Sequence, residues 1–264
     1  HGFGMRELNL PSDTWIRRLA DWMGEYGWMW PVKPTGWRAN TNYKDHKKYS
    51  RMQEELNRTD WGNLRKYAKE NEALKPLKAN EKRVVFMGNS ITEGWKNTRP
   101  SFFAGRPYIN RGISGQTTPQ MLLRFRDDVI NLKPAVVVIL AGINDIAGNT
   151  GPMTLEQSFD NIASMAELAR ANNIKVVISS VLPAYDFPWR PGMQPAEKVV
   201  ALNKMLKEYA AKHKHVYVDY FSAMADARKG LPKHLAHDEI HPTEEGYKMM
   251  EPMVEKGIAE ALKK

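Results

Sequence analysis

Residues 84–95 read VVFMGNSITEGW, and this stretch decides how the chain is expected to fold. Four apolar residues run into Gly88 and a polar pair, and the residues after the pair have the pattern of a first helical turn. An uninterrupted apolar run is typical of a strand that is buried on both faces. The stretch therefore predicts a buried strand that passes directly into a helix, with Ser90 at the corner between them.

Short β-branched runs recur along the rest of the chain and alternate with longer stretches of helical periodicity. The predicted strands are 83–88, 108–110, 135–142, 174–181 and 215–220. The predicted helices are 118–130, 154–172, 195–213 and 243–263. Strands that alternate with helices in this way form a parallel sheet covered by helices. The sequence therefore predicts an α/β fold, a three-layer α/β/α domain over residues 81–264 with five parallel strands.

Residues 1–80 differ from the rest because they hold most of the tryptophans and no clear strand. The six tryptophans are Trp15, Trp22, Trp28, Trp30, Trp37 and Trp61. Amphipathic helices are predicted over 14–26 and 60–73, each after a capping residue. The aromatic side chains are expected to pack this N-terminal extension onto the main domain or onto a second copy of the chain, which would make a homo-oligomer. An aromatic platform for sugar rings is the alternative.

Composition narrows the classes of protein that this chain can belong to. With 264 residues, 42% hydrophobic and 26% charged, it has the balance of an ordinary globular protein. No apolar run reaches the roughly 18 residues of a membrane span, and no signal peptide is evident at the start. The absence of cysteine excludes disulfides and thiolate sites without identifying a compartment; a periplasmic or secreted location is slightly favoured over a cytoplasmic one.

A formal net charge of +9 raises the question of a nucleic-acid partner, because clustered Lys and Arg bind phosphates. The densest clusters, KDHKKYSR at 44–51 and RKYAK at 65–69, are weak. A net positive charge by itself indicates solubility more directly than it indicates a binding partner. We therefore expect a solvated basic surface and no nucleic-acid partner.

Polar residues follow the predicted strands at the points where the chain leaves the sheet. The segments are GNS at 88–90, NRGISGQTT at 110–118 and AGIND at 141–145, and a late segment reads HDEIHPTEEGY at 237–247. In an open α/β sheet, ligands bind outside the carboxyl ends of the strands. Each segment supplies a residue type that acyl transfer needs.

A serine nucleophile and its base can be recognised in these segments. Ser90 stands at the start of a helix, where its hydroxyl can project above the sheet, although a serine there is more often only a helix cap. His241 lies three residues after Asp238, so the carboxylate can orient one ring nitrogen while the other faces the serine. The alternatives for His241 are the start of a proline-led helix, with Thr243 as its cap, and a metal site with His234, His237 and Asp238, which Pro242 disfavours.

Three hydrogen-bond donors are expected to converge near Ser90. Asn144 follows the central strand, and Gly115 lies in a loop before Thr118 and Pro119, a cap and first-turn pair. Together with the N–H of Ser90, the N–H of Gly115 and the amide of Asn144 form an oxyanion hole. Taken singly, each would be interpreted as a turn residue. Four such segments in the correct order make that interpretation less favourable.

The four segments together resemble the SGNH hydrolases, also called the GDSL esterase/lipase family, over about residues 82–262. The resemblance implies a flavodoxin-like fold, Ser90 as nucleophile, His241 as base and Asp238 as the residue that orients it. It also implies Gly115 and Asn144 as oxyanion donors, and neither a cofactor nor a metal. Where the family has Gly-Asp-Ser this chain has Gly-Asn-Ser; Asn89 removes a local charge but no catalytic group.

Within that family, YINRGISGQTTPQMLLRF and LAGINDIAGN are similar to the platelet-activating-factor acetylhydrolase-like and carbohydrate acetylesterase branches. We therefore expect a serine esterase for short acyl groups, acetate above all, with a small-molecule or carbohydrate ester as substrate. Trp189 and Arg190, in a loop predicted above the site, are candidate substrate contacts. The alternatives are a lipase, lysophospholipase or thioesterase for longer chains, and a non-catalytic carbohydrate-binding protein on the same fold.

Overall fold

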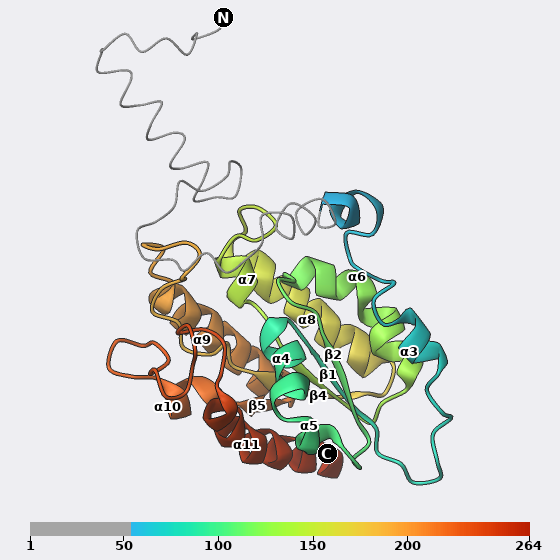
Figure 1. Cartoon of the computed structure of the whole chain (residues 1–264). Coiled ribbons are helices and arrows are strands. Elements are labelled where there is room, and N and C mark those ends of the chain that lie inside the picture. Colours follow the sequence, from blue (N-terminus) through green and yellow to red (C-terminus); the bar gives the residue numbers. More distant parts are fainter. Residues whose placement is uncertain (1–53) are drawn as a thin grey trace, which may run out of the picture. The chain divides into compact units, whose positions relative to one another are not determined.

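Five parallel strands form one sheet, in the order β2-β1-β3-β4-β5, in the computed structural model, which describes residues 54–264 (Figure 1). The strands are β1 (Val84–Gly88), β2 (Tyr108–Gly112), β3 (Val136–Leu140), β4 (Lys175–Ser179) and β5 (Val216–Val218). The chain runs from β1 outward to β2 and then returns to the other side of β1 for β3. A sheet of this order binds ligands outside its carboxyl ends, at the point between β1 and β3 where the direction reverses.

The strands form where the apolar runs predicted them. Every residue of β1 and β3 is buried, because the sheet is covered on both faces. Their register pairs Val84 with Val136 and Gly88 with Leu140, so the carboxyl ends of the two strands lie side by side. The observed strands agree with the predicted ones to within about three residues at each end. The predicted α/β fold with five parallel strands is confirmed.

Helices cover both faces of the sheet (Figure 1). The helices α6, α8 and α9 lie along one face, and α4, α5 and α11 lie on the other. Their bounds are α4 (Ser90–Thr98), α5 (Pro100–Phe103), α6 (Thr118–Asp128), α8 (Leu155–Ala171), α9 (Ala196–His213) and α11 (Glu244–Lys263). Shorter segments are α3 (Ala68–Glu72), η1 (Ile130–Leu132), α7 (Ile143–Ile146) and α10 (Tyr220–Met224). The four long helices predicted after residue 110 are confirmed.

An aromatic cluster joins α4 to α11. Trp95 of α4 stacks on Tyr247 of α11 with ring centroids 5.5 Å apart, and the Tyr247 hydroxyl donates to the carbonyl of Ile91 at 2.8 Å. Arg99 pairs with Glu251 at 2.9 Å farther along the same two helices. Burying one large aromatic side chain contributes about 1.5–3 kcal/mol. The cluster therefore fixes the helix that begins at Ser90 against the helix that begins just after His241.

The described part of the N-terminal extension places its helices differently from the prediction. The predicted helix over 60–73 is wrong for its first half, because only Ala68–Glu72 of that range is helical, and a helix that was not predicted lies before it at residues 54–59. Residues 61–67 form turns in which the Asp60 carboxylate accepts from the N–H groups of Leu64 and Arg65 at 2.8 and 3.0 Å, and Asn63 has a φ of +52°. Asp60 hydrogen bonds to the backbone here as in a turn, so the chain does not continue into a helix.

Residues 54–264 belong to one compact unit, so residues 54–80 are part of the same unit as the predicted hydrolase domain. The predicted helix at 14–26 and the tryptophans Trp15, Trp22, Trp28, Trp30 and Trp37 lie outside the described residues, and the division of the chain at residue 80 stays a prediction. Among residues 54–264, no helix combines the length and apolar character needed to cross a membrane.

Candidate active site

Ser90 occupies the corner between β1 and α4, where the chain passes very close to its neighbours. A Cβ atom on Gly88 would lie only 2.8 Å from the carbonyl oxygen of Leu140, so β3 leaves room for glycine alone. The N-cap of α4 is Asn89, whose side-chain oxygen accepts from the N–H of Ile91 at 3.0 Å. Asn89 therefore provides the cap that Ser90 could have supplied, and the Ser90 hydroxyl is left for another partner.

That partner is His241, which arrives from the far end of the chain. The Ser90 Oγ lies 2.9 Å from His241 Nε2, and His241 Nδ1 lies 2.7 Å from Asp238 Oδ2. A carboxylate can only accept hydrogen bonds, so Nδ1 must carry the proton and Nε2 is left as the acceptor for the serine hydroxyl. The three predicted residues thus form one continuous hydrogen-bonded chain.

A tight turn holds Asp238 in the orientation that this chain needs. Its second oxygen, Oδ1, accepts from the backbone N–H groups of Ile240 and His241 at 3.1 and 2.7 Å. Burial acts to raise the pKa of Asp238, but the hydrogen bonds from the His241 ring and backbone and the attraction to that ring outweigh it and lower the pKa to about 2. Asp238 is therefore ionised throughout the neutral pH range.

The turn ends where the last helix begins, as the sequence predicted for Thr243. The Thr243 hydroxyl accepts from the N–H of Gly246 at 3.1 Å and is the N-cap of α11. Among residues 54–264, no three His, Asp or Glu side chains converge in a way that could hold a metal ion. Of the four residues weighed as metal ligands, Asp238 and His241 hydrogen-bond each other.

The two other predicted oxyanion donors lie on neighbouring loops that are joined to each other. Gly115 has a φ of +77°, a conformation that side chains rarely adopt, and a Cβ there would meet only open space. Asn144 lies in the short helix α7 and is buried, and its Nδ2 donates to the carbonyl of Gln116 at 2.9 Å. The hydrogen bond places the Asn144 amide beside the loop that carries Gly115.

Comparison with known proteins shows which family has this arrangement. The model of the GDSL-like lipase/acylhydrolase family matches residues 86–249, more than half of the chain. The chain belongs to this family. It is a GDSL esterase, a carboxylic ester hydrolase that acts on small-molecule ester substrates, and its recognition from the four segments is confirmed.

Several relatives of this GDSL esterase are similar over most of its length. A GDSL-like lipase from Bacteroides thetaiotaomicron VPI-5482 is 51% identical with a TM-score of 0.75, and the match covers 76% of this chain and all of that one. Esterase TesA from Pseudomonas aeruginosa is 30% identical over 59% of this chain and 73% of its own. An acetylxylan esterase from Geobacillus stearothermophilus is 25% identical over 54% of this chain and 67% of its own.

Asp145, which follows the predicted oxyanion donor Asn144 in this GDSL esterase, makes contacts that the sequence did not indicate. Its carboxylate accepts from the Thr118 N–H at 3.0 Å and from the Thr118 hydroxyl, which joins α7 to the start of α6. Burial raises the pKa of Asp145, although the hydrogen bonds from Thr118 oppose the shift. The predicted cap of α6 at Thr118 is wrong by one residue: Thr117 is the N-cap, and Thr118 holds Asp145 instead.

Arg124 is a second supporting residue that local sequence patterns could not identify. Its guanidinium is completely buried, pairs with Asp128 at 2.9 Å, and donates to the Gln116 side chain at 2.6 Å. It also donates to the carbonyls of Arg111 and Gly88 at 2.9 and 3.1 Å. One side chain on α6 therefore holds together the exits of β1 and β2. Arg124 and Asp128 are spaced (i, i+4), as in the ion pairs common on exposed helix surfaces, so the sequence gives no sign that this pair is buried.

The two predicted substrate contacts lie on the loop that precedes α9. Trp189 is 37% exposed, and its ring centroid lies 6.3 Å from that of His241. The Arg190 guanidinium donates to the carbonyl of Ala147 and so ties the loop to the end of α7. A cavity of about 660 Å³ lies beside them, between the 186–191 loop and the turn at 233–239 that carries Asp238. Trp189 thus lies next to His241, the predicted base, and Arg190 holds the loop.

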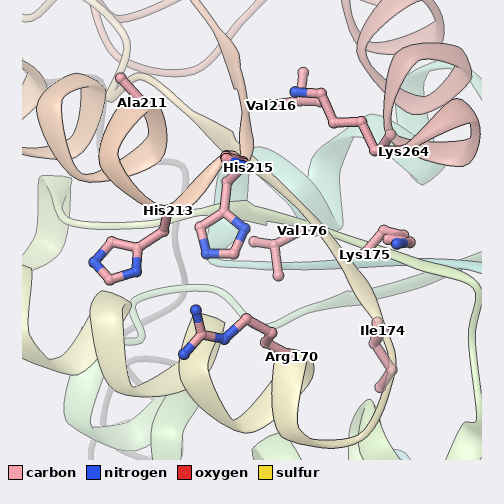
Figure 2. A pocket seen from close by; sticks show the side chains of 11 residues that line it. Arg170, Ile174, Lys175, Val176, Ala211, His213, His215, Val216 and Lys264 are labelled. Atoms are coloured by element: carbon pink, nitrogen blue, oxygen red, sulfur yellow. The ribbon is translucent and has the colours of Figure 1, made fainter.

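A second cavity, of about 630 Å³, lies at the amino ends of the strands, where β4 and β5 begin (Figure 2). Its basic lining residues are Arg170, Lys175, His213, Lys214, His215 and Lys264. Arg170 and His213 lie in the last turns of α8 and α9, where cations compensate the negative ends of helix dipoles. Three of the six basic residues, Arg170, His213 and Lys214, therefore lie at these two helix ends.

Proposed function

We propose that this GDSL esterase hydrolyses short-chain esters, acetyl esters above all, on a carbohydrate, through an acyl-enzyme on Ser90. The observation that carries the proposal is the unbroken chain from Asp238 through His241 to the Ser90 hydroxyl, with distances of 2.7 and 2.9 Å. A serine hydroxyl is a poor nucleophile unless a base removes its proton, and this chain supplies a correctly oriented base.

In the first step, His241 Nε2 takes the proton of Ser90 as Oγ attacks the ester carbonyl carbon. The carbonyl oxygen becomes an oxyanion, which accepts hydrogen bonds from the N–H groups of Ser90 and Gly115 and from the Asn144 amide. The tetrahedral intermediate then breaks its bond to the alcohol oxygen. His241 gives its proton to that oxygen, so the alcohol leaves neutral and the acyl group remains on Ser90.

In the second step, water takes the place of the alcohol. His241 Nε2 removes a proton from the water as its oxygen attacks the acyl carbon, and the same three donors stabilise the second oxyanion. The bond to Ser90 Oγ breaks, and His241 returns the proton to the serine. The ionised Asp238 stabilises the imidazolium that forms in both steps, which its lowered pKa of about 2 allows at neutral pH.

Two observations support acetylated sugars as the substrate class. One relative carries the name acetylxylan esterase, and it matches more than half of this chain. The exposed Trp189 lies beside His241, and an aromatic face there is suited to packing against a sugar ring. Arg190, next in the chain, would support the same contact by anchoring the loop.

The test compares p-nitrophenyl acetate, butyrate and octanoate with the wild-type chain, Ser90→Ala and the matched control Ser101→Ala, an exposed serine on α5. Rates that fall steeply with acyl length and are lost only in Ser90→Ala are expected. A flat or rising profile would show instead a lipase or thioesterase for longer chains. Full activity in Ser90→Ala would overturn the serine mechanism.

The sugar is tested with Trp189→Ala and with Tyr185→Ala as the control, an aromatic residue of similar exposure on the same loop. We expect Trp189→Ala to raise KM for an acetylated xylo-oligosaccharide several-fold while leaving p-nitrophenyl acetate nearly unchanged. An equal effect on both substrates, or none on either, would remove the carbohydrate from the proposal.

A further inference from the structure

The loop that carries Gly115 is held from outside by a short segment before the sheet. The segment comprises residues 61–67, which we call the brace, and it precedes the part of the chain that the family model matches, 86–249. Gly115 itself has no side chain to fix it, and the space around its Cβ position is open. The carbonyl of Gly115 accepts from the Asn149 amide at 3.2 Å, and the direction of its N–H depends also on how its two neighbours, Ser114 and Gln116, are held.

Ser114, on one side of Gly115, is held by Glu93 and through it by the brace. One carboxylate oxygen of Glu93 accepts from the Ser114 N–H at 2.8 Å and from its hydroxyl at 2.5 Å. The other oxygen forms an ion pair with Lys66. Burial acts to raise the pKa of Glu93, but the hydrogen bonds from Lys66 and Ser114 lower it overall. Glu93 is therefore ionised at neutral pH and can accept from both partners at once.

Gln116, on the other side of Gly115, is held by the brace directly. Its side chain is almost fully buried and donates from Nε2 to the carbonyl of Gly62 at 2.9 Å. Its Oε1 accepts from Arg124, and its backbone carbonyl accepts from the Asn144 amide. One residue thus joins the brace to two of the three proposed oxyanion donors.

The brace is also tied to the end of β2 and to the start of α6. The Tyr67 hydroxyl donates to the carbonyl of Gly112, and the Arg111 guanidinium lies 4.6 Å from the centre of the Tyr67 ring. The Gln120 side chain donates to the carbonyl of Trp61 at 2.8 Å. Burial raises the pKa of Tyr67, so its hydroxyl remains a neutral donor over the working pH range. The brace therefore contacts the chain before Gly115, at Gly112, and after it, at Gln116 and Gln120.

We propose that the brace is a positioning element of the oxyanion hole, with Lys66 acting through Glu93 and Ser114 on the N–H of Gly115. The proposal rests on the proposed function, because the hole matters only if Ser90 forms an acyl-enzyme. Lys66 does not touch the reacting atoms. It fixes the geometry of a donor that is needed most in the transition state, so its loss lowers kcat and leaves KM nearly unchanged.

The experiment compares Lys66→Met and Lys66→Arg with the matched control Lys69→Met, an exposed lysine three residues farther on. Deleting an oxyanion donor outright lowers turnover by about 10²- to 10³-fold, so misplacing one is expected to lower kcat by roughly 10-fold. Lys66→Met should show this loss with KM changed less than about twofold. Lys66→Arg, which keeps the charge, should recover most of the activity, and Lys69→Met should equal the wild type.

A second measurement separates positioning from folding. The inhibition constant of a boronic acid, whose tetrahedral adduct on Ser90 places an oxygen in the hole, should rise in Lys66→Met by the same factor by which kcat falls. Thermal unfolding establishes that each variant is folded at the assay temperature. Tyr67→Phe removes only the hydroxyl that donates to the Gly112 carbonyl. It is expected to lower kcat and to raise the inhibition constant by smaller, matching factors.

The outcomes distinguish the two proposals. Wild-type kcat and boronate inhibition in both Lys66→Met and Tyr67→Phe, with activity still lost in Ser90→Ala, would overturn the brace and leave the serine esterase intact. An equal loss in Lys66→Met and Lys69→Met would also overturn it, because the effect would then follow surface charge. Activity that survives in Ser90→Ala would overturn the proposed function, and the role of the brace in the oxyanion hole would be lost with it.

Discussion

The two ends of the sheet both gather titratable side chains around a cavity, yet their physical chemistry is opposite. At the carboxyl ends of the strands, Asp238 and His241 attract each other and Ser90 completes the chain. At the amino ends, the groups around His215 are mainly basic, and burial together with His213, Arg170 and Lys264 lowers the pKa of His215 to about 4 (Figure 2). A cluster of ionisable residues therefore indicates a catalytic site only where its members are one another's partners.

The largest change in kcat is expected when one histidine from each end of the sheet is replaced. His241→Ala removes the base of the proposed mechanism, and kcat for p-nitrophenyl acetate is expected to fall by about 10⁴- to 10⁶-fold, as for other serine hydrolase triads. His215→Gln should leave kcat within about twofold of the wild type, since its partners lie at the far edge of the sheet. Comparable losses in the two variants would mean that the distinction between the two ends is wrong.

A smaller effect is expected from the oxyanion hole, which belongs to the first end alone. Asn144→Ala should lower kcat by about 10²- to 10³-fold with little change in KM, because its amide acts mainly on the transition state. The matched control is Asn131→Ala, an exposed asparagine in η1 that should keep the wild-type rate. A near wild-type rate in Asn144→Ala would remove this residue from the hole.

The smallest expected effect is the contribution of His215 to the pH dependence of folding stability. His215 has a pKa near 4 when folded and about 6.5 when unfolded, so the unfolded chain binds more protons as pH falls through this interval. Protonation of His215 therefore favours the unfolded chain. The folded state has its full stability above about pH 6.5 and loses this contribution as pH falls toward 4. Tyr209, His213, Arg170 and Lys264 face this group, with Glu167 and Glu260 nearby on α8 and α11.

His215→Gln should therefore lose less thermal stability than the wild type between pH 7 and pH 5, measured as Tm under the same buffer and salt. Asp238 acts in a lower window, because its pKa of about 2 lies below the unfolded value of about 3.9. Its contribution is present above about pH 4 and is lost as pH falls toward 2. Parallel Tm curves for His215→Gln and the wild type over pH 5–7 would show that His215 does not titrate as described.

Many features of the fold could be predicted because local patterns carry them. The run VVFMG becomes β1, and the VVVIL portion of the apolar run at 135–142 becomes β3, because continuous apolar residues suit a strand covered on both faces. The cap at Thr243 and the turn glycine Gly115 mark where the chain enters a helix or leaves a strand, whereas the cap of α4 is Asn89 and not Ser90. Ser90 and His241 could be proposed because each lies where a helix begins or just before it, and Asp238 because it stands three residues before His241.

The sequence by itself therefore determined the order of strands and helices and the family, and it predicted the members of the triad, all of which depend on short-range patterns and ordered segments. Only the tertiary structure decided how the brace turns and what it contacts. Lys66 meets Glu93 and Gln116 meets Gly62 across 27 and 54 residues of chain, and no periodicity records such pairs. Arg124 is buried for the same reason: its partners, the carbonyls of Gly88 and Arg111, converge on it only when the sheet has formed.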